Sequence, residues 1–284
     1  MPSSPRVVVC GPASWNHLIA LDHLPEPVPH MQFAQRSWHT IGGTSAGKAL
    51  HLAGLGVDVH LRAQIGDDED GARLRERLAQ AGVVVEAIAS ERTERHVNLM
   101  AGGGGRVSLY VSTPSTPSVD AVEAAVSAVA GADLAVIDLS ELGRLVLEAM
   151  PRRETPLWMD LHDYDGATGF HEPFLRAAEG VFMNDDGTED PWGLMASCLD
   201  RGPRLAVCTL GAKGAIALEA DGTRHEVAAT PATVVDTNGA GDAFMAGFLA
   251  AWLGGEPVDV ALRAAADQAR VAIETEHLHP ALDR

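Results

Sequence analysis

The chain lacks several features that would place it in other protein classes. Its cysteines, Cys10, Cys198 and Cys208, are too few and too widely spaced for a disulfide framework or a zinc cluster. No apolar run reaches the ~18 residues of a membrane helix, and the first residues lack a charged-then-apolar signal pattern. We therefore expect buried thiols, no membrane partner and a cytoplasmic location.

Basic residues are also scarce. The 284 residues include 21 Lys and Arg against 39 Asp and Glu, which gives a formal net charge of −18. This charge opposes nonspecific binding to nucleic acid, so we expect no nucleic-acid partner. A small phosphate ligand remains compatible with it, because a local site can bind one anion.

What the chain does contain predicts an α/β protein, since 46% of its residues are hydrophobic, enough for one large core. The apolar run Arg6–Cys10 predicts a buried first strand. Further along, helical patterns at 119–130 and 143–149 alternate with strand patterns at 134–138 and 157–161. This rhythm predicts a doubly wound, mostly parallel sheet flanked by helices, in a single domain over 1–284.

Four segments do not follow this rhythm. Residues 13–21 and 31–40 alternate with a period of two, and so do 96–101 and 106–112 around Gly102–Gly105. They predict two antiparallel pairs that form a small β-sheet lid, within about 13–40 and 96–113. Three of its aromatic residues, Trp15, Phe33 and Trp38, could stack on a ligand. Such a lid can also pair between subunits, so a homodimer through the lid is a further hypothesis.

The stretch 234–253, VVDTNGAGDAFMAGFLAAWL, is the most informative part of the chain. A short β-branched run, small residues around Asn238 and a long apolar segment predict a strand, a turn and a buried helix. Free N–H groups at the start of that helix would bind an anion, and Asp242 beside it could accept a proton from a hydroxyl group. An anion site next to a base indicates phosphoryl transfer, whereas a glycine-rich turn with a helix-start aspartate is the simpler alternative.

The residues Asp236, Thr237, Gly239, Ala240, Gly241 and Asp242, with Gly247, resemble the C-terminal signature of the ribokinase or PfkB-type sugar and nucleoside kinases. The resemblance implies a ribokinase-like fold and transfer of the ATP γ-phosphate, with ATP and Mg²⁺ required. It implies that Asp242 is the catalytic base and that the amides of Gly239, Ala240, Gly241 and Asp242 stabilise the transferring phosphate. It also implies a monovalent cation such as K⁺ near Asp236.

The stretch 41–56, IGGTSAGKALHLAGLG, allows two interpretations. Gly42 to Lys48 fits the start of a P-loop, GxxxxGK, but Ala49 stands where a hydroxyl would bind magnesium. The same residues resemble the N-terminal kinase motif, which implies acceptor binding by Gly42, Gly43, Gly47 and Lys48, and by Asn16 after the first strand. The family usually has Asn at the position of Gly47 and Asp at that of Asn16, so the acceptor is left open.

Two later segments resemble the family's nucleotide site. Asn184 and Asp185 begin a motif that usually reads N-x-x-E and organises magnesium, but Gly187 replaces the Glu. Residues 209–214, TLGAKG, resemble the nucleotide loop. The implied nucleotide contacts are Asn184, Thr209, Gly211, Lys213, Gly214, Thr237 and Gln268, and the implied metal ligands are Asp185 and Asp236.

These observations predict a kinase acting on a primary hydroxyl of a small sugar or sugar-like acceptor. Two alternatives remain open: a nucleoside kinase, and a sensor on the same fold that binds ligand without turning it over.

Overall fold

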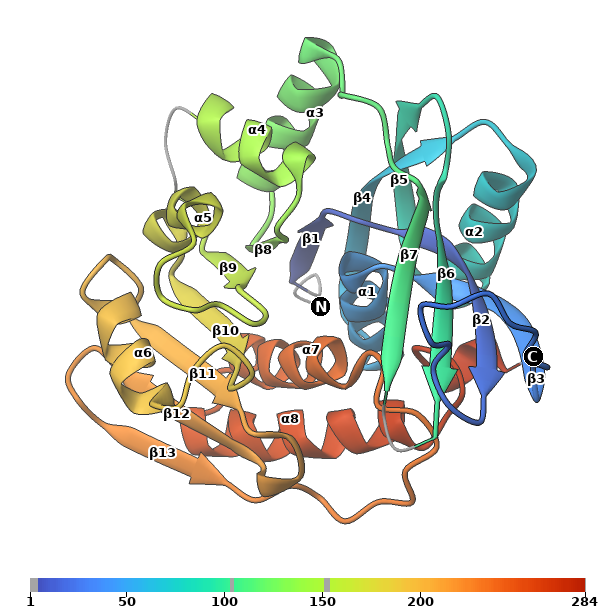
Figure 1. Ribbon diagram of the computed structural model, residues 1–284. Helices are drawn as coiled ribbons and strands as arrows, with labels where there is room; N and C mark the ends of the chain where they lie inside the picture. The colour runs from blue at the N-terminus through green and yellow to red at the C-terminus, as the bar shows by residue number, and fades with distance from the viewer. Residues whose placement is uncertain (1–4, 103–104, 151–153, 284) are drawn as a thin grey trace.

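The computed structural model describes residues 5–102, 105–150 and 154–283. Among these residues the large sheet has nine strands (Figure 1). In spatial order they are β13 (Arg224–Val227), β12 (Ala215–Glu219), β11 (Leu205–Thr209), β10 (Gly180–Asn184), β9 (Leu157–Asp160), β8 (Leu134–Ile137), β1 (Arg6–Cys10), β4 (Asp58–Gly66) and β5 (Val84–Ser90). The strands from β11 to β5 pair in parallel, and β12 and β13 add an antiparallel edge.

Helices cover both faces of this sheet. One face packs against α1 (Thr44–Gly54), α2 (Glu69–Gln80), α7 (Ala240–Leu253) and α8 (Val258–Ile273). The other packs against α3 (Val119–Ala130), α4 (Glu141–Ala149), α5 (Glu172–Ala177) and α6 (Pro191–Leu199). The central strands β1, β8 and β9 are therefore almost entirely buried, which is why their sequences are apolar runs rather than alternating patterns, apart from Arg6 at the start of β1 and Asp160 at the end of β9. The predicted doubly wound, mostly parallel sheet flanked by helices is confirmed.

The lid is a separate sheet in the order β3 (Arg36–Gly42), β2 (Ser14–Leu21), β6 (Glu94–Ala101) and β7 (Arg106–Ser112). Strands β2 and β3 pair antiparallel, as do β6 and β7, while β2 and β6 are parallel. Part of the predicted turn at Gly102–Gly105, residues 103–104, lies outside the described residues. The lid stands over the carboxyl ends of the central strands (Figure 1).

Three details differ from the sequence prediction. Val234 and Val235 are not a strand: both are exposed, and the Val235 amide donates to Ile273 O at the end of α8, at 2.7 Å. Phe33 is not on a lid strand, because β3 begins only at Arg36, and its side chain is 89% exposed. Strand β5 was not predicted, since VVEAIAS mixes apolar residues with a charge on a half-exposed sheet edge.

No helix among the described residues is long and apolar enough to cross a membrane.

Candidate active site

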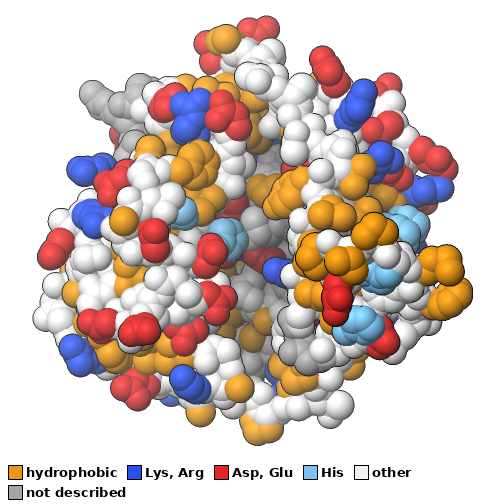
Figure 2. All heavy atoms as spheres, in the orientation of Figure 1, with side chains coloured by type: hydrophobic (Ala, Val, Ile, Leu, Met, Phe, Trp, Pro, Cys, Tyr) orange, Lys and Arg blue, Asp and Glu red, His pale blue; other side chains and the backbone are white. Residues whose placement is uncertain are grey.

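The main cavity lies between the lid and the large sheet, where β8, β9 and β10 end (Figure 2). Its volume is about 640 Å³. Ligand sites of open α/β sheets form at such carboxyl ends. The sheet contributes Leu139, Asp160, His162, Asp163, Asn184 and Asp186; the lid contributes Asn16, Glu94, His96, Asn98, Arg106, Ser108 and Tyr110; the starts of α1 and α7 contribute Gly42, Gly43, Thr44 and Thr237 to Asp242.

The start of α7 forms one wall of this cavity. Gly239 is the N-cap and has a φ of 80°, a conformation that glycine adopts without strain. Among the described residues, no backbone or side-chain acceptor pairs with the amides of Gly241 and Asp242. A Cβ atom on Gly241 would meet nothing within 4 Å, so the helix presents bare backbone to the cavity. Unpaired amides at the positive end of a helix dipole form an anion-binding site.

Asp242 lies in the first turn of α7, beside these amides. Its Oδ1 accepts a hydrogen bond from Lys48 Nζ at 2.8 Å and another from the Thr44 hydroxyl. The side chain is only 12% exposed. The pKa of Asp242 is raised above its ordinary value, mainly by burial. Lys48 opposes this shift, whereas the nearby Asp160 adds to it. The site thus holds a carboxylate with more affinity for a proton than an exposed aspartate has.

Lys48 is the centre of a buried charge cluster beneath the cavity. Its side chain is completely buried, and its Nζ lies 3.1 Å from Asp138 Oδ1, 3.1 Å from Asp160 Oδ2 and 2.8 Å from Asp242 Oδ1. Burial alone would lower the pKa of Lys48, but the three carboxylates raise it well above the usual value. Lys48 is therefore a permanent cation, and it compensates carboxylates that would otherwise repel one another.

Asp160 links this cluster to the wall of the cavity. Burial disfavours its charged form, yet His162 and Lys48 lower the pKa of Asp160 to about 2. Its Oδ1 accepts from the His162 backbone amide at 3.0 Å. His162 is the only described non-glycine residue with a positive φ, 53°. Such a backbone is uncommon and clusters at functional sites, and here Asp160 holds it in place.

The structure gives a steric reason for each of the two glycines that depart from the family pattern. A Cβ on Gly47 would lie 2.7 Å from Asp242 Oδ2, so a side chain at 47 would displace that carboxylate. A Cβ on Gly187 would lie 2.5 Å from Asp163 O and 2.7 Å from Tyr164 O. The loop after β9 therefore occupies the space that a Glu at 187 would need.

The residues predicted to bind the acceptor separate into two groups. Asn16, Gly42 and Gly43 line the cavity, and Asn16 Oδ1 accepts from Ser14 Oγ at 2.8 Å. Gly47 and Lys48 lie below the cavity, on the buried side of α1. The Lys48 ammonium is enclosed by carboxylates and does not reach the cavity surface.

The residues predicted to bind nucleotide are also divided. Asn184 and Thr237 line the cavity. Thr209 is the last residue of β11, and Gly211, Lys213 and Gly214 lie in the β11–β12 connection, where Gly211 and Gly214 have φ values of 56° and 102°. This connection is largely exposed and is not part of the cavity wall. Gln268 points between helices instead, with its Nε2 2.7 Å from His51 Nδ1.

The two predicted metal ligands do not line the cavity. Asp236 Oδ1 accepts from the Asn238 amide at 2.9 Å, which holds the loop before α7. Asp185 donates its amide to Thr209 O at 3.2 Å. Within the described ranges, no three His, Cys, Asp or Glu side chains are arranged to hold a metal ion.

Sequence reasoning did not identify Asp138 and Asp160 as site residues. Both could have been found from the sequence, because Asp138 directly follows the buried strand β8, Asp160 is the last residue of the buried strand β9, and such strand ends meet at one edge of the sheet. Lid residues Arg106 and Tyr110 carried no comparable signal. Arg106 Nη1 donates to Asn238 Oδ1 at 2.8 Å, which ties the lid to the loop before α7.

Comparison with known proteins identifies the family of this chain. The model of the pfkB family of carbohydrate kinases matches residues 4–282. The acarbose 7(IV)-phosphotransferase of Actinoplanes sp. is 32% identical over 263 residues, covering 90% of this chain and 88% of that protein. The ATP-dependent ribose-1-phosphate kinase of Halopiger xanaduensis is 28% identical over 273 residues, covering 90% and 88%.

Solved structures show the same fold. A microbiome-derived acarbose kinase has a TM-score of 0.84 at 26% identity, covering 96% of this chain and 94% of its own. Arabidopsis thaliana ribokinase, complexed with ribose and ATP, has a TM-score of 0.81 at 23% identity, covering 99% and 96%. The family model and the kinase relatives define an ATP-dependent phosphotransferase with an alcohol group as acceptor. The chain belongs to the pfkB family of carbohydrate kinases, which confirms the family resemblance.

Proposed function

We propose that this enzyme transfers the γ-phosphate of ATP to a primary hydroxyl of a small sugar or sugar-like acceptor, with Asp242 as the base. The observation that carries the proposal is the position of the Asp242 carboxylate beside the unpaired amides that begin α7. One group can take the hydroxyl proton while its neighbours bind the negative charge of the phosphoryl group.

The reaction balances with these groups alone. The acceptor oxygen attacks the γ-phosphorus, the bond from that phosphorus to the β–γ bridging oxygen breaks, and ADP leaves with the bond's electron pair. The hydroxyl proton passes to Asp242. We propose that the amides of Gly239, Ala240, Gly241 and Asp242 stabilise charge on the transferring group, with those of Gly241 and Asp242 unpaired in the protein. Catalysis of this kind is mostly positioning and electrostatics.

Mg²⁺ fits the cavity better than it fits the predicted pair of ligands. The Asn184 and Asp186 side chains line the cavity and offer the oxygen donors that magnesium prefers, and this ion needs few protein ligands because it keeps several waters. When bound, it neutralises charge on the nucleotide phosphates. We propose these two residues as its nearest protein donors, and the loop at Asp236 as the place for K⁺.

An acceptor screen tests the proposal. ADP release would be measured with ATP and with fructose, ribose, glucose, adenosine and acarbose, the last being the acceptor that the Actinoplanes relative's name gives. Saturable phosphorylation of a sugar is expected. Activity on adenosine alone would identify a nucleoside kinase instead, and ATP binding with no phosphorylated acceptor would favour a sensor.

The role of Asp242 has its own test. Asp242→Asn keeps the shape of the side chain but cannot accept the proton, so turnover should fall by ~10²–10⁴-fold while ATP affinity stays within a few-fold. Asp221→Asn, at the exposed β12–β13 turn, is the matched control and should be unaffected. Near-normal turnover in Asp242→Asn would refute the base.

We also propose that the lid mediates a homodimer. Val107, Leu109 and Val111 alternate with the cavity residues Ser108 and Tyr110 along β7, so they face away from the cavity and are exposed. Apolar side chains gather over the lid in Figure 2. Because β7 is also an edge strand, a second copy could cover this face. Sedimentation of a concentration-independent monomer would exclude it.

A further inference from the structure

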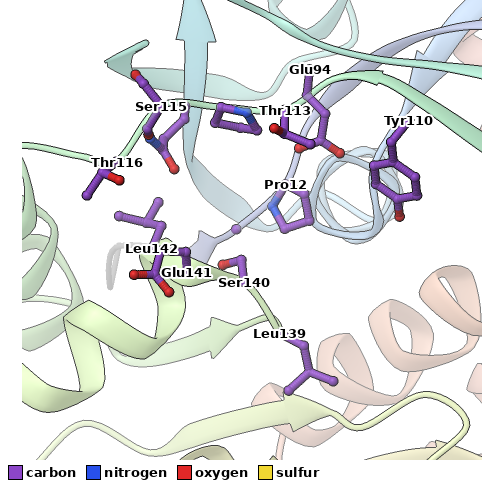
Figure 3. A pocket seen from close by; sticks show the side chains of 13 residues that line it. Pro12, Glu94, Tyr110, Thr113, Ser115, Thr116, Leu139, Ser140, Glu141 and Leu142 are labelled. Carbon is purple, nitrogen blue, oxygen red and sulfur yellow. The ribbon is translucent and has the colours of Figure 1, made fainter. Parts of the chain in front are cut away.

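A second cavity of about 390 Å³ adjoins the main one (Figure 3). The two share Pro12, Glu94, Tyr110 and Leu139 as lining residues. Asp242 and the start of α7 line only the main cavity, so the second cavity extends from the side away from phosphoryl transfer. Its volume alone falls within the range of small-molecule sites, ~300–1,000 Å³. An acceptor that fills the main cavity therefore has room to continue.

The second cavity is lined by groups that bind hydroxyls. Thr113, Ser115, Thr116 and Ser140 contribute hydroxyl groups, and Glu94 and Glu141 contribute carboxylates. Thr113 and Thr116 are exposed at the wall of this cavity, so their hydroxyls are accessible to a ligand.

The charge of the second cavity selects against anions. No Lys, Arg or His is among the described residues that line it. Both of its carboxylates already have partners, since Glu94 Oε1 lies 2.8 Å from His96 Nε2, and Glu141 Oε1 lies 2.7 Å from Arg144 Nη2. A neutral, hydroxyl-rich group fits this surface, whereas a phosphate would face two carboxylates and no basic lining residue.

Tyr110 stands where the two cavities meet. Figure 3 places it at one end of the second cavity, with Thr116 and Leu142 toward the other. Its side chain is 65% exposed although it lies in the cleft, and its ring packs on His96 with centroids 4.0 Å apart. An exposed aromatic ring offers a flat apolar surface with a polar tip, which suits the apolar face of a sugar ring.

We propose that the second cavity is a subsite for a second, neutral sugar unit, so that the preferred acceptor is a glycoside of at least two units. The inference rests on the proposed function, in which the unit that is phosphorylated occupies the main cavity. The second unit lies beyond Tyr110 and Pro12, with its hydroxyls on Thr113 and Thr116.

Paired acceptors test the subsite. kcat/KM would be measured for glucose against maltose, for fructose against sucrose, and for glucose against glucose 1-phosphate. At least one disaccharide should exceed its monosaccharide by about tenfold or more, because its second unit adds contacts that the single sugar lacks. Glucose 1-phosphate should be the poorest acceptor. Disaccharides that are no better than monosaccharides, or a preference for glucose 1-phosphate, would overturn the proposal.

A variant that fills the cavity links this preference to the site. The preference for the disaccharide is its kcat/KM divided by that of the monosaccharide. Thr116→Trp should lower this ratio by about tenfold, because the indole occupies the space of the second unit. Thr116→Ser keeps both hydroxyl and space, and should keep the ratio. An unchanged ratio in Thr116→Trp would refute the subsite.

Binding of the same sugars, measured by calorimetry without ATP, distinguishes failure of the kinase proposal from failure of the subsite proposal. If no sugar is phosphorylated but the disaccharide binds and Thr116→Trp abolishes that binding, the kinase proposal fails and the subsite stands. If sugars are phosphorylated and the disaccharide binds no more tightly than its monosaccharide, the subsite fails and the kinase stands. Absence of disaccharide binding to the unmodified enzyme would also refute the subsite.

Discussion

The ammonium nitrogen of Lys48 lies 2.8 Å from Oδ1 of Asp242, across a sequence separation of 194 residues. The contact joins the buried side of α1 to the first turn of α7, and it fixes the carboxylate that we propose as the base. Because Asp138 and Asp160 also face this ammonium group, a change at Lys48 affects three carboxylates together.

Stability should depend strongly on Lys48. Lys48→Met keeps most of the side-chain volume but leaves three buried carboxylates without their cation, so we expect a loss of about 3–5 kcal/mol in the free energy of unfolding at pH 7.5. Urea unfolding at this pH measures it. Lys213→Met, on an exposed loop, is the control, and a loss below about 1 kcal/mol would contradict the prediction.

The acid limb of the pH profile should report on Asp242. Asp242 must be ionised to accept a proton, and burial raises its pKa, so kcat/KM should fall with acid at a pH above the ordinary aspartate value of 3.8. The neighbours act in opposite directions. Lys48 lowers this pKa, so Lys48→Met should move the limb to higher pH; Asp160 raises it, so Asp160→Asn should move the limb to lower pH. If the acid limbs of both variants move in the same direction, and circular dichroism shows that both are folded, Asp242 is not the titrating group.

A single methyl group at position 47 should impair catalysis. The Cβ of Gly47→Ala would meet Asp242 Oδ2 at 2.7 Å, closer than real Cβ contacts, so the carboxylate or α1 must shift. Because misplacing a reacting group by about 1 Å can cost ~10²-fold, we expect kcat to fall by at least about tenfold with ATP affinity nearly unchanged. Gly169→Ala, whose Cβ meets nothing within 4 Å, is the matched control. Equal kcat values in the two variants would show that α1 absorbs the methyl group.

His51 should make the fold sensitive to mild acid. The buried His51 ring has its Nε2 2.7 Å from Leu278 O and its Nδ1 2.7 Å from Gln268 Nε2. Burial is the main cause that lowers the pKa of His51, to about 3, and the nearby His279 lowers it as well. The folded state therefore binds this proton less readily than the unfolded state, whose ordinary pKa is about 6.5. The stability that this residue contributes is fully present above pH 6.5 and is lost as the pH falls toward 3.

Thermal unfolding between pH 7.5 and 5.5 measures this effect, because most carboxylates stay ionised in both states over that range. Tm should decrease with acid in the unmodified protein and decrease less in His51→Gln, which keeps hydrogen-bonding groups but does not titrate. Parallel Tm curves for the two proteins would assign the acid sensitivity elsewhere.

Local patterns were sufficient for most of the secondary structure. The helix predicted at 119–130 is α3, and strand patterns at 134–138 and 157–161 lie within one residue of β8 and β9. The run at 234–235 failed because its backbone pairs with the end of α8 rather than with a strand, and no local pattern records that partner. β-branched residues favour extended backbone, but only a neighbouring strand makes a sheet.

The doubly wound fold, the lid and a glycine-rich helix start with Asp242 in its first turn follow from local patterns, because periodicity and glycine act over a few neighbouring residues. Long-range packing brings Lys48 to Asp138, Asp160 and Asp242, and it extends the main cavity past Tyr110 into a second one. No local pattern records these neighbours, because the groups come from α1, the ends of β8 and β9, the lid and α7. Their distances are set by the order of strands in the sheet and by helix packing, and burial then fixes which charges compensate one another.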